Sequence, residues 1–299
     1  MLNVSREQFF YSFSKDNSHA LKVPSGSTIV LDTWDCFQDQ IQSEQTTVSS
    51  IDWNRINPAT GPIYVEGAKP GDVLKVRIDA IELGAQGLMA AGPGLGVMGH
   101  RLDAMRFKVI PVQDGHAVFD DKLRLPLNPM IGVIGVAPEG EAVSCGTPGP
   151  HGGNMDTKLI TTGATLYLPV FQEGALFGLG DVHAAMGDGE VGVTGIEIPA
   201  KVTVTLEVLS GRAIPYPFVE NEEGIAAIVS KETLDEAAKS AVEVMIDALL
   251  PHMEMSLPEL IMLCSAAGQS QISQIVDPLM TARFFMPKSV LDAYGVHLF

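Results

Sequence analysis

Residues 69–79 read Lys-Pro-Gly-Asp-Val-Leu-Lys-Val-Arg-Ile-Asp, a turn that runs directly into alternating apolar and charged side chains. Successive side chains of a β-strand point to opposite faces, so Leu74, Val76 and Ile78 share an apolar face and the charged residues share the other. The stretch therefore predicts a strand with one buried face.

The same combination of a glycine or proline turn and a strand-like stretch recurs along the first two thirds of the chain. Further strands are predicted within residues 24–32, 107–119, 165–171, 175–183 and 202–208. Residues 107–119 predict a hairpin around Asp114-Gly115. Many short strands with closely spaced turns indicate a β-sandwich or barrel.

The last seventy residues have a different pattern, with apolar residues at helical spacing in 230–250. Ser256 and Glu259 form a capping-box pattern that predicts a second helix ending near Gly268, and 289–292 predict a short third one. We therefore predict a mainly β (α+β) chain with a C-terminal helical layer.

No clear linker interrupts the sequence, so we expect one domain over residues 1–299. Its β-rich body would span 1–215 and its mostly helical part 216–299, with the helices packed on the body.

The composition excludes several classes of partner. Nineteen Lys and Arg against 36 Asp and Glu give a net charge of −17, which disfavours nucleic acid and acidic lipid surfaces. No apolar run is long enough for a membrane span, and no secretory signal pattern is visible. Three widely spaced cysteines predict no disulfide framework, so we expect a cytoplasmic protein.

The densest polar stretch is 180–190, Gly-Asp-Val-His-Ala-Ala-Met-Gly-Asp-Gly-Glu. Asp181 and His183 are two residues apart at the end of an apolar strand, so they share a face. A turn through 186–189 would bring Glu190 close to His183. Carboxylates and an imidazole suit a divalent metal ion. The alternative is a solvated hairpin tip, in which Asp and Gly only serve the turn.

A second cluster is 145–156, Cys-Gly-Thr-Pro-Gly-Pro-His-Gly-Gly-Asn-Met-Asp. Glycines allow the backbone to approach a ligand closely. His151, Asn154 and Asp156 would supply a ligand or base, a carbonyl-polarising amide and an orienting carboxylate. In the alternative, the glycines serve loop geometry and His151 only caps a carbonyl. Cys145 is either a nucleophile or a small buried hydrophobe.

Two further patterns are weaker. Asp32 and Asp35 end a strand, and both can serve one site only if the strand breaks there; otherwise they are turn-forming residues. Residues 94–99 match the spacing G-x-G-x-x-G, but a strand rather than a helix is predicted after them, which disfavours dinucleotide binding. A mobile loop over a pocket is the alternative.

Several long stretches, in order, resemble the acetamidase/formamidase family. They cover residues 57–74, 135–139, 151–156, 168–190 and 195–199. The resemblance implies an enzyme that cleaves the C–N bond of short aliphatic amides to a carboxylate and ammonia. It also implies a jelly-roll-like β-sandwich, a homodimer or other homo-oligomer, and a divalent metal, zinc or calcium. The stretches around His151 and His183 should line the site, with Asp35 beside them.

A mechanism follows as a hypothesis. Amide hydrolysis needs an activated water and protonation of the departing amine, and a divalent metal supplies the first. The predicted metal ligands are Asp35, His151, Asp181, His183 and Glu190.

The remaining catalytic roles are assigned as predictions. Glu141 is the predicted general base. Asn154, or the amides of Gly152 and Gly153, would stabilise the oxyanion. His151 counts with Glu141 and Asn154 as a predicted catalytic residue.

Two other functions fit the same residues. A metal-binding β-sandwich without catalysis would also explain the carboxylates, although a carbohydrate-binding module should have aromatic platforms and only 6% of residues are aromatic. A metal hydrolase acting on other small amides or on esters is the second alternative.

Overall fold

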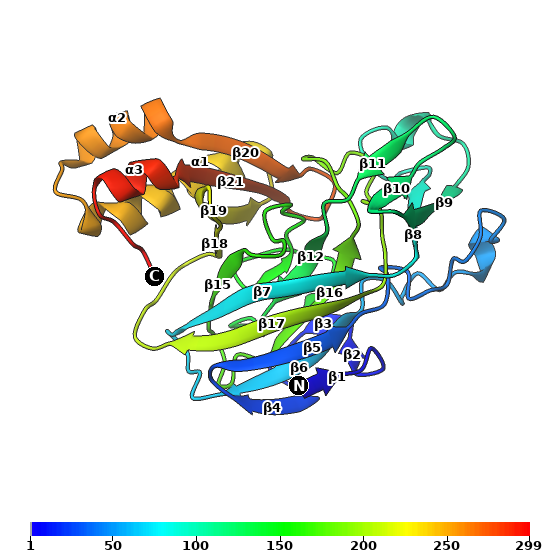
Figure 1. Cartoon of the computed structure of the whole chain (residues 1–299), viewed down its shortest axis with the longest axis horizontal. Helices are drawn as coiled ribbons and strands as arrows, with labels where there is room; N and C mark the ends of the chain where they lie inside the picture. Colours follow the sequence, from blue (N-terminus) through cyan, green and yellow to red (C-terminus); the bar gives the residue numbers. More distant parts are fainter. Residues whose placement is uncertain (1) are drawn as a thin grey trace.

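Two β-sheets packed face to face form the body of the protein in a computed structural model that describes residues 2–299 (Figure 1). The larger sheet has nine strands, and the stretch around residue 74 forms one of its central strands, β7. In sheet order the strands are β1 (Leu2–Val4), β5 (Ser27–Asp32), β17 (Ala200–Leu209), β7 (Val73–Leu83), β15 (Thr165–Pro169), β18 (Phe218–Glu220), β19 (Gly224–Lys231), β21 (Met280–Pro287) and β20 (Gln269–Gln274).

The second sheet carries most of the polar stretches singled out in the sequence. Its strands are β14 (Gly152–Asn154), β12 (Met130–Gly135), β16 (Phe177–His183), β6 (Ala59–Glu66) and β2 (Phe9–Phe10), with β4 (Leu21–Pro24) paired to β6. A separate pair is formed by β3 (Ser12–Phe13) and β13 (Val143–Ser144).

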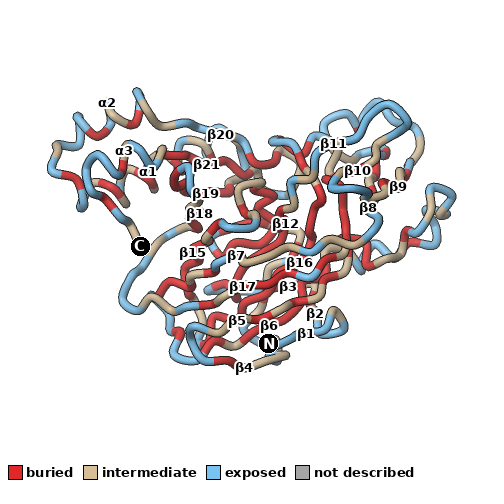
Figure 2. The backbone as a smooth tube through the Cα atoms, in the orientation of Figure 1, coloured by how far each residue is buried: buried red, intermediate tan, exposed pale blue. Residues whose placement is uncertain are grey.

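The main core lies between the two sheets. Leu74, Val76 and Ile78 of β7 are buried in it together with Ile134 of β12 and Phe177 of β16. Figure 2 shows the buried residues concentrated along these strands, whereas the turns at the ends are exposed. The predicted β-sandwich is confirmed, because alternating strands from both sheets bury their apolar faces against each other.

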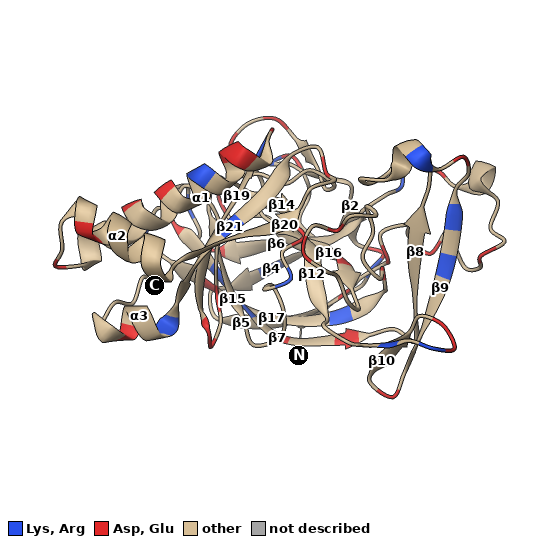
Figure 3. Cartoon of the chain, turned by 90° about the horizontal axis from the view of Figure 1, so that it is seen from above, with Lys and Arg blue, Asp and Glu red and all other residues tan. Residues whose placement is uncertain are grey.

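The helices lie at one end of the molecule (Figure 1). They are α1 (Leu234–Leu249), α2 (Leu257–Ala267) and α3 (Lys288–Ala293), followed after α1 by a short 3-10 turn at Leu250–His252. Two further 3-10 turns, Val48–Ser50 and Gly99–Arg101, lie in the opposite part of the molecule (Figure 1). The capping box of Ser256 and Glu259 begins α2 and Gly268 ends it, as predicted. The charged residues of α1 lie on its outer face (Figure 3), while its buried face packs on β19 and β21.

The C-terminal part contains more than helices. Strands β18 to β21 extend the nine-stranded sheet through this part, which was predicted to be mostly helical. The prediction missed these strands because the sequences of β19 and β21, buried almost throughout, alternate too little to distinguish a strand from a helix.

A four-stranded sheet forms the opposite end (Figure 1). It contains β8 (Gln86–Ala91), β9 (Arg106–Gln113), β10 (His116–Val118) and β11 (Arg124–Pro126). The predicted hairpin around Asp114-Gly115 is confirmed by the pairing of β9 and β10. The stretch before the G-x-G-x-x-G pattern of residues 94–99 forms the regular strand β8, which pairs with β9. Within residues 2–299, no helix combines the length and apolarity needed to span a bilayer.

Candidate metal centre

His183, the last residue of β16, lies at the centre of a buried group of carboxylates. Its Nε2 atom is 3.1 Å from Oε1 of Glu197 and 3.6 Å from Oδ1 of Asp181. The same nitrogen is 3.9 Å from Oδ1 of Asp156 and 3.9 Å from Oε1 of Glu190. Four carboxylates from three separate parts of the chain therefore converge on one imidazole.

Two glycines make this convergence possible. A Cβ atom on Gly132 of β12 would collide with the carboxylate of Asp156 and lie 2.7 Å from Oδ2 of Asp181. A Cβ atom on Gly195 would lie 2.7 Å from Cγ and Nδ1 of His183. The site therefore requires the absence of side chains at these two positions.

Three of the carboxylate residues have left-handed backbone conformations. The φ angles are 41° at Asp156, 52° at Asp181 and 43° at Glu190. Such angles are uncommon in residues other than glycine and are held by the surrounding structure. Their occurrence at three members of one cluster indicates a functional site.

Several polar atoms of the cluster lack hydrogen-bond partners within residues 2–299. Within residues 2–299, both carboxylate oxygens of Asp156, both ring nitrogens of His183 and Oε2 of Glu197 are buried without a hydrogen bond of acceptable geometry. Oδ2 of Asp277 and Oδ1 of Asn154 are in the same situation. Buried polar groups are normally paired, and hard oxygens with an imidazole are suitable ligands of a divalent cation. The residues therefore fit a bound metal ion.

Burial and the neighbouring charges shift the pKa values of the cluster. Burial raises the pKa of Glu197 to about 8. Burial, helped by the charge of Asp181, raises the pKa of Asp156 to about 6. Burial opposes the charged form of His183, but Glu197 and Asp181 outweigh it and raise its pKa well above the ordinary value. Five carboxylates, counting Asp277, thus face one imidazole in a buried space that favours a positive ion.

A small cavity opens onto the cluster. Its volume is about 220 Å³ and its polar lining includes Asn154, Asp181, Glu190, Glu197 and Asp277. Cys36, Phe37, Trp53, Ile56 and Leu95 provide much of the remaining wall. The carboxylates of Asp181 and Glu197 lie within 4.8 Å of the thiol of Cys36, so a second group of possible ligands adjoins the first.

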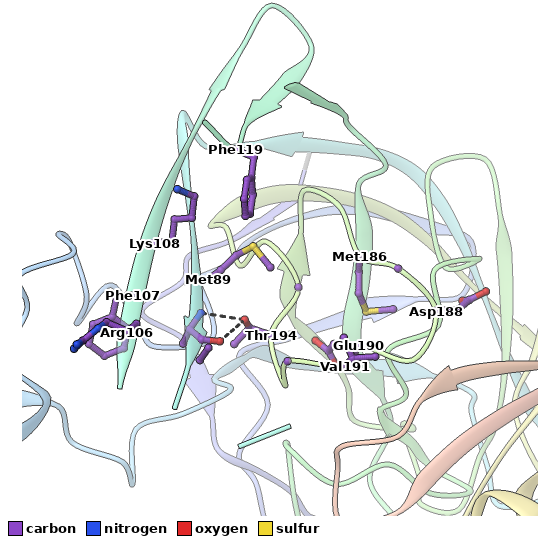
Figure 4. Close-up of a pocket in the computed structure, with 15 residues that line it drawn as sticks. Met89, Arg106, Phe107, Lys108, Phe119, Met186, Asp188, Glu190, Val191 and Thr194 are labelled. Atoms are coloured by element: carbon purple, nitrogen blue, oxygen red, sulfur yellow. Dashed lines mark hydrogen bonds between the residues drawn. The ribbon is translucent and has the colours of Figure 1, made fainter. Parts of the chain in front are cut away.

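Glu190 also lines a larger apolar cavity of about 430 Å³ (Figure 4). Met89, Phe119 and Met186 line it. Thr194 hydrogen-bonds to the backbone of Ala90 in the wall that the two cavities share.

The sequence matches the Acetamidase/Formamidase family over residues 5–145 and 139–293. The chain belongs to this family.

Similar structures cover almost the whole chain. A "predicted acetamidase/ formamidase" from Thermoanaerobacter tengcongensis is 50% identical with a TM-score of 0.97, over 99% of this chain and 98% of that one. An acetamidase from Bacillus halodurans is 47% identical with a TM-score of 0.96, over 99% and 100% of the chains. A formamidase from Methylophilus methylotrophus is 26% identical over 206 residues, 48% of this chain and 49% of that protein. The chain therefore spans about half the length of that curated relative.

Among the residues predicted from the acetamidase/formamidase resemblance, Asp181, His183 and Glu190 lie together in the cluster, and Asn154 lines its cavity. Asp35 has a different environment. Its Oδ1 atom accepts hydrogen bonds from the backbone N–H groups of Phe37 and Asp39, at 2.9 and 2.8 Å, as a turn-forming aspartate does.

His151 is not brought to the carboxylates. Its ring packs edge-on against Phe13, with centroids 5.3 Å apart, and burial lowers its pKa to about 4. Gly152 and Gly153 lie in β14, where side chains would collide with the backbone of Ile134 and Thr147. These glycines therefore serve close strand packing.

Glu141 also lies away from the cluster. It is exposed in the connection between β12 and β13, outside the set of residues that line the 220 Å³ cavity. Residues 139–142 around it are exposed as well.

Two members of the site were missed. Glu197 lies in the family stretch 195–199, and its position between two buried isoleucines was a usable signal, since a charged residue in an apolar run is rarely buried without a function. Asp277 had no local signal, because only the fold brings the loop between β20 and β21 to the cavity. Asp156, by contrast, was predicted to orient other groups and lies in the cluster itself.

Proposed function

We propose that this protein is an amidohydrolase that cleaves the C–N bond of short aliphatic amides to a carboxylate and ammonia, using a divalent metal ion, zinc or calcium. Family membership supports the reaction class. The observation that carries the metal proposal is the buried convergence of unpaired carboxylate and imidazole atoms on Nε2 of His183.

The ion would be held by the residues that converge there: Asp156, Asp181, His183, Glu190 and Glu197. When bound, it would supply Lewis acidity and lower the pKa of a water molecule from about 16 towards 7. This set replaces Asp35 and His151 with Asp156 and Glu197.

The chain's own residues would supply the remaining chemistry. Asp277 lines the cavity but is outside both compact ligand groups, so its carboxylate is available to accept a proton and return it to the departing nitrogen. The side-chain N–H of Asn154 would hold the amide carbonyl oxygen. A cavity of about 220 Å³ is small for a drug-sized ligand and suits an amide with a short acyl chain.

Metal analysis combined with ammonia release from formamide and acetamide tests the proposal. We expect a stoichiometric divalent ion, loss of turnover on chelation and its return with zinc or calcium. His183→Ala should abolish turnover, whereas His116→Ala, on the hairpin of β9 and β10, should not.

Three results would contradict parts of this proposal. Undiminished turnover in metal-free protein would exclude the metal role. Metal binding without ammonia release from any amide would favour the non-catalytic metal-binding sandwich. Preferential cleavage of esters in the same panel would favour the other metal hydrolase. The homo-oligomer and the cytoplasmic location stay predictions.

A further inference from the structure

Arg283 of β21 is a buried cation that the metal centre does not contain. Its side chain is 1% exposed. Nη2 donates to both carboxylate oxygens of Asp188, at 3.0 and 2.9 Å. Its other donors reach Oε1 of Gln271 at 2.7 Å, the carbonyl of Ile272 at 2.8 Å and Oγ of Ser273 at 3.0 Å.

Arg283 joins the segment that carries Glu190 to the C-terminal strands. Asp188 precedes Glu190 by two residues, in the turn after β16. The backbone of the intervening Gly189 bonds to Ser273 and Ile275, with N–H to oxygen distances of 2.8 and 3.2 Å. The hydrogen bonds from Nη2 of Arg283 to Asp188 and the backbone pairing of Gly189 together fix the position of Glu190 in the cluster.

The other two carboxylate segments meet at the same point. Ser273, which accepts from Arg283, also accepts from Oγ1 of Thr157, the neighbour of Asp156. Gln274, the next residue, accepts the backbone N–H of Asp277 at 2.9 Å. Arg283 is thus linked to the segment of Glu190 through Asp188 and to that of Asp156 through Ser273, whereas the segment of Asp277 is held by Gln274, the neighbour of Ser273.

The pair joins a buried Arg283 to an Asp188 side chain that is 33% exposed. Such a partly buried pair is weak evidence for a stabilising role, because exposed ion pairs contribute little and apolar residues often stabilise a buried position as well or better. Positioning explains the pair better here. Glu190 has a left-handed backbone and its carboxylate is buried among like charges, so its segment needs external support.

We propose that Arg283 is a positioning residue that, through Asp188, holds Glu190 in the metal centre. The inference rests on the proposed function for its activity readout, but zinc affinity tests it independently. Residues that orient metal ligands through a second contact typically contribute about 10–100-fold to metal affinity or activity.

Three variants test the pair. Asp188→Asn keeps the shape of the side chain and removes the charge, and Arg283→Lys removes the planar fork. Lys158→Met is the matched control, because Lys158 contacts the same carboxylate of Asp188 at 2.9 Å from a partly exposed position. Metal-depleted proteins are titrated with zinc chloride by calorimetry, and kcat and KM for acetamide are measured in the reloaded proteins.

We expect Asp188→Asn and Arg283→Lys to weaken zinc binding about 10–100-fold and to lower kcat with little change in KM. Lys158→Met should stay within about twofold of the wild type, as exposed ion pairs contribute little. Wild-type zinc affinity and kcat in folded Asp188→Asn protein would overturn the proposal. An equal loss in Lys158→Met would also overturn it, because the effect would then be a general one of charge.

The double variant Arg283→Met with Asp188→Leu separates positioning from stability. It should recover unfolding free energy relative to Arg283→Met alone, while zinc affinity stays weak. Recovery of both would assign Arg283 a structural role only. If the double variant does not fold, Asp188→Asn still decides. A wild-type protein that binds zinc but releases no ammonia would refute the proposed function and leave the zinc comparison intact.

Discussion

Gly195→Ala is the sharpest single perturbation of the metal centre. The φ angle of Gly195 is not in the left-handed region, so alanine adds no backbone strain. Its Cβ atom would lie 2.7 Å from Cγ and Nδ1 and 3.2 Å from Cβ of His183. Ordinary contacts begin at 3.4 Å, so the imidazole must retreat by about 0.7 Å.

The size of the effect follows from this displacement. His183 is fully buried, so its ring has no free space into which to move, and overpacking of this kind costs about 1–3 kcal/mol of stability. A misplacement approaching 1 Å costs on the order of 10²-fold in rate. We therefore expect kcat/KM for acetamide to fall on the order of 10²-fold, with weaker zinc binding in the metal-depleted protein.

Gly192→Ala is the matched control in the same loop. Nothing lies within 4 Å of a Cβ atom at Gly192, and its φ angle is also outside the left-handed region. Ammonia release and urea unfolding should be measured for both variants. If folded Gly195→Ala retains the kcat/KM of the control, the close contact with His183 does not position the site and the reasoning is wrong.

Three further predictions concern Cys145, the choice between Glu141 and Asp277 as general base, and His151. Cys145→Ala should keep kcat/KM within a few fold, because Cys145 is fully buried and burial raises the pKa of its thiol; loss of activity in folded protein would restore it as a nucleophile. Glu141→Gln should leave turnover unchanged, whereas Asp277→Asn should lower kcat about 10²-fold or more, and the reverse order would return the general base to Glu141. Burial lowers the pKa of His151 to about 4, so the stability it contributes is complete above pH 6.5 and is lost as pH falls towards 4. Urea unfolding at pH 6.5 and pH 4 should therefore show a fall in the free energy of unfolding of up to about 3 kcal/mol in the wild type that is absent from His151→Gln. An equal fall in the wild type and the variant would contradict this prediction.

Many strands of the β-rich body could be predicted because their sequences carry a local periodicity or turn. Alternation around Leu74 and the turn at Asp114-Gly115 are local signals, and both elements form where expected. Strands β19 and β21 lack this signal. They are buried almost throughout, and their place in the sheet is set by pairing with each other and by α1 covering them.

The residues of the candidate site likewise divide into those with a local sequence signal and those without one. Asp181 and His183 could be paired because two residues on one strand share a face, and Glu190 follows after a turn. His151 was predicted from a stretch of glycines, and in the structure Gly152 lies close to the backbone of β12 and Gly153 close to that of Thr147. Asp277 is about ninety residues from its partners in the chain, so no spacing rule could find it.

The electrostatics of the cluster give its function a physical basis. Asp156, Glu190, Glu197 and Asp277 all have raised pKa values, first because burial opposes their charge and then because they repel one another. Protons are one way to relieve this repulsion, and a divalent cation at the same place is another. The two compete for the same oxygens, since carboxylate ligands must be deprotonated to bind a metal. The overall acidity of the chain does not create this condition, because most acids lie on exposed faces such as that of α1. The repulsion arises because the carboxylates converge on His183. Gly132, Gly195 and the left-handed backbone at three carboxylate residues are the features of the fold that make this convergence possible.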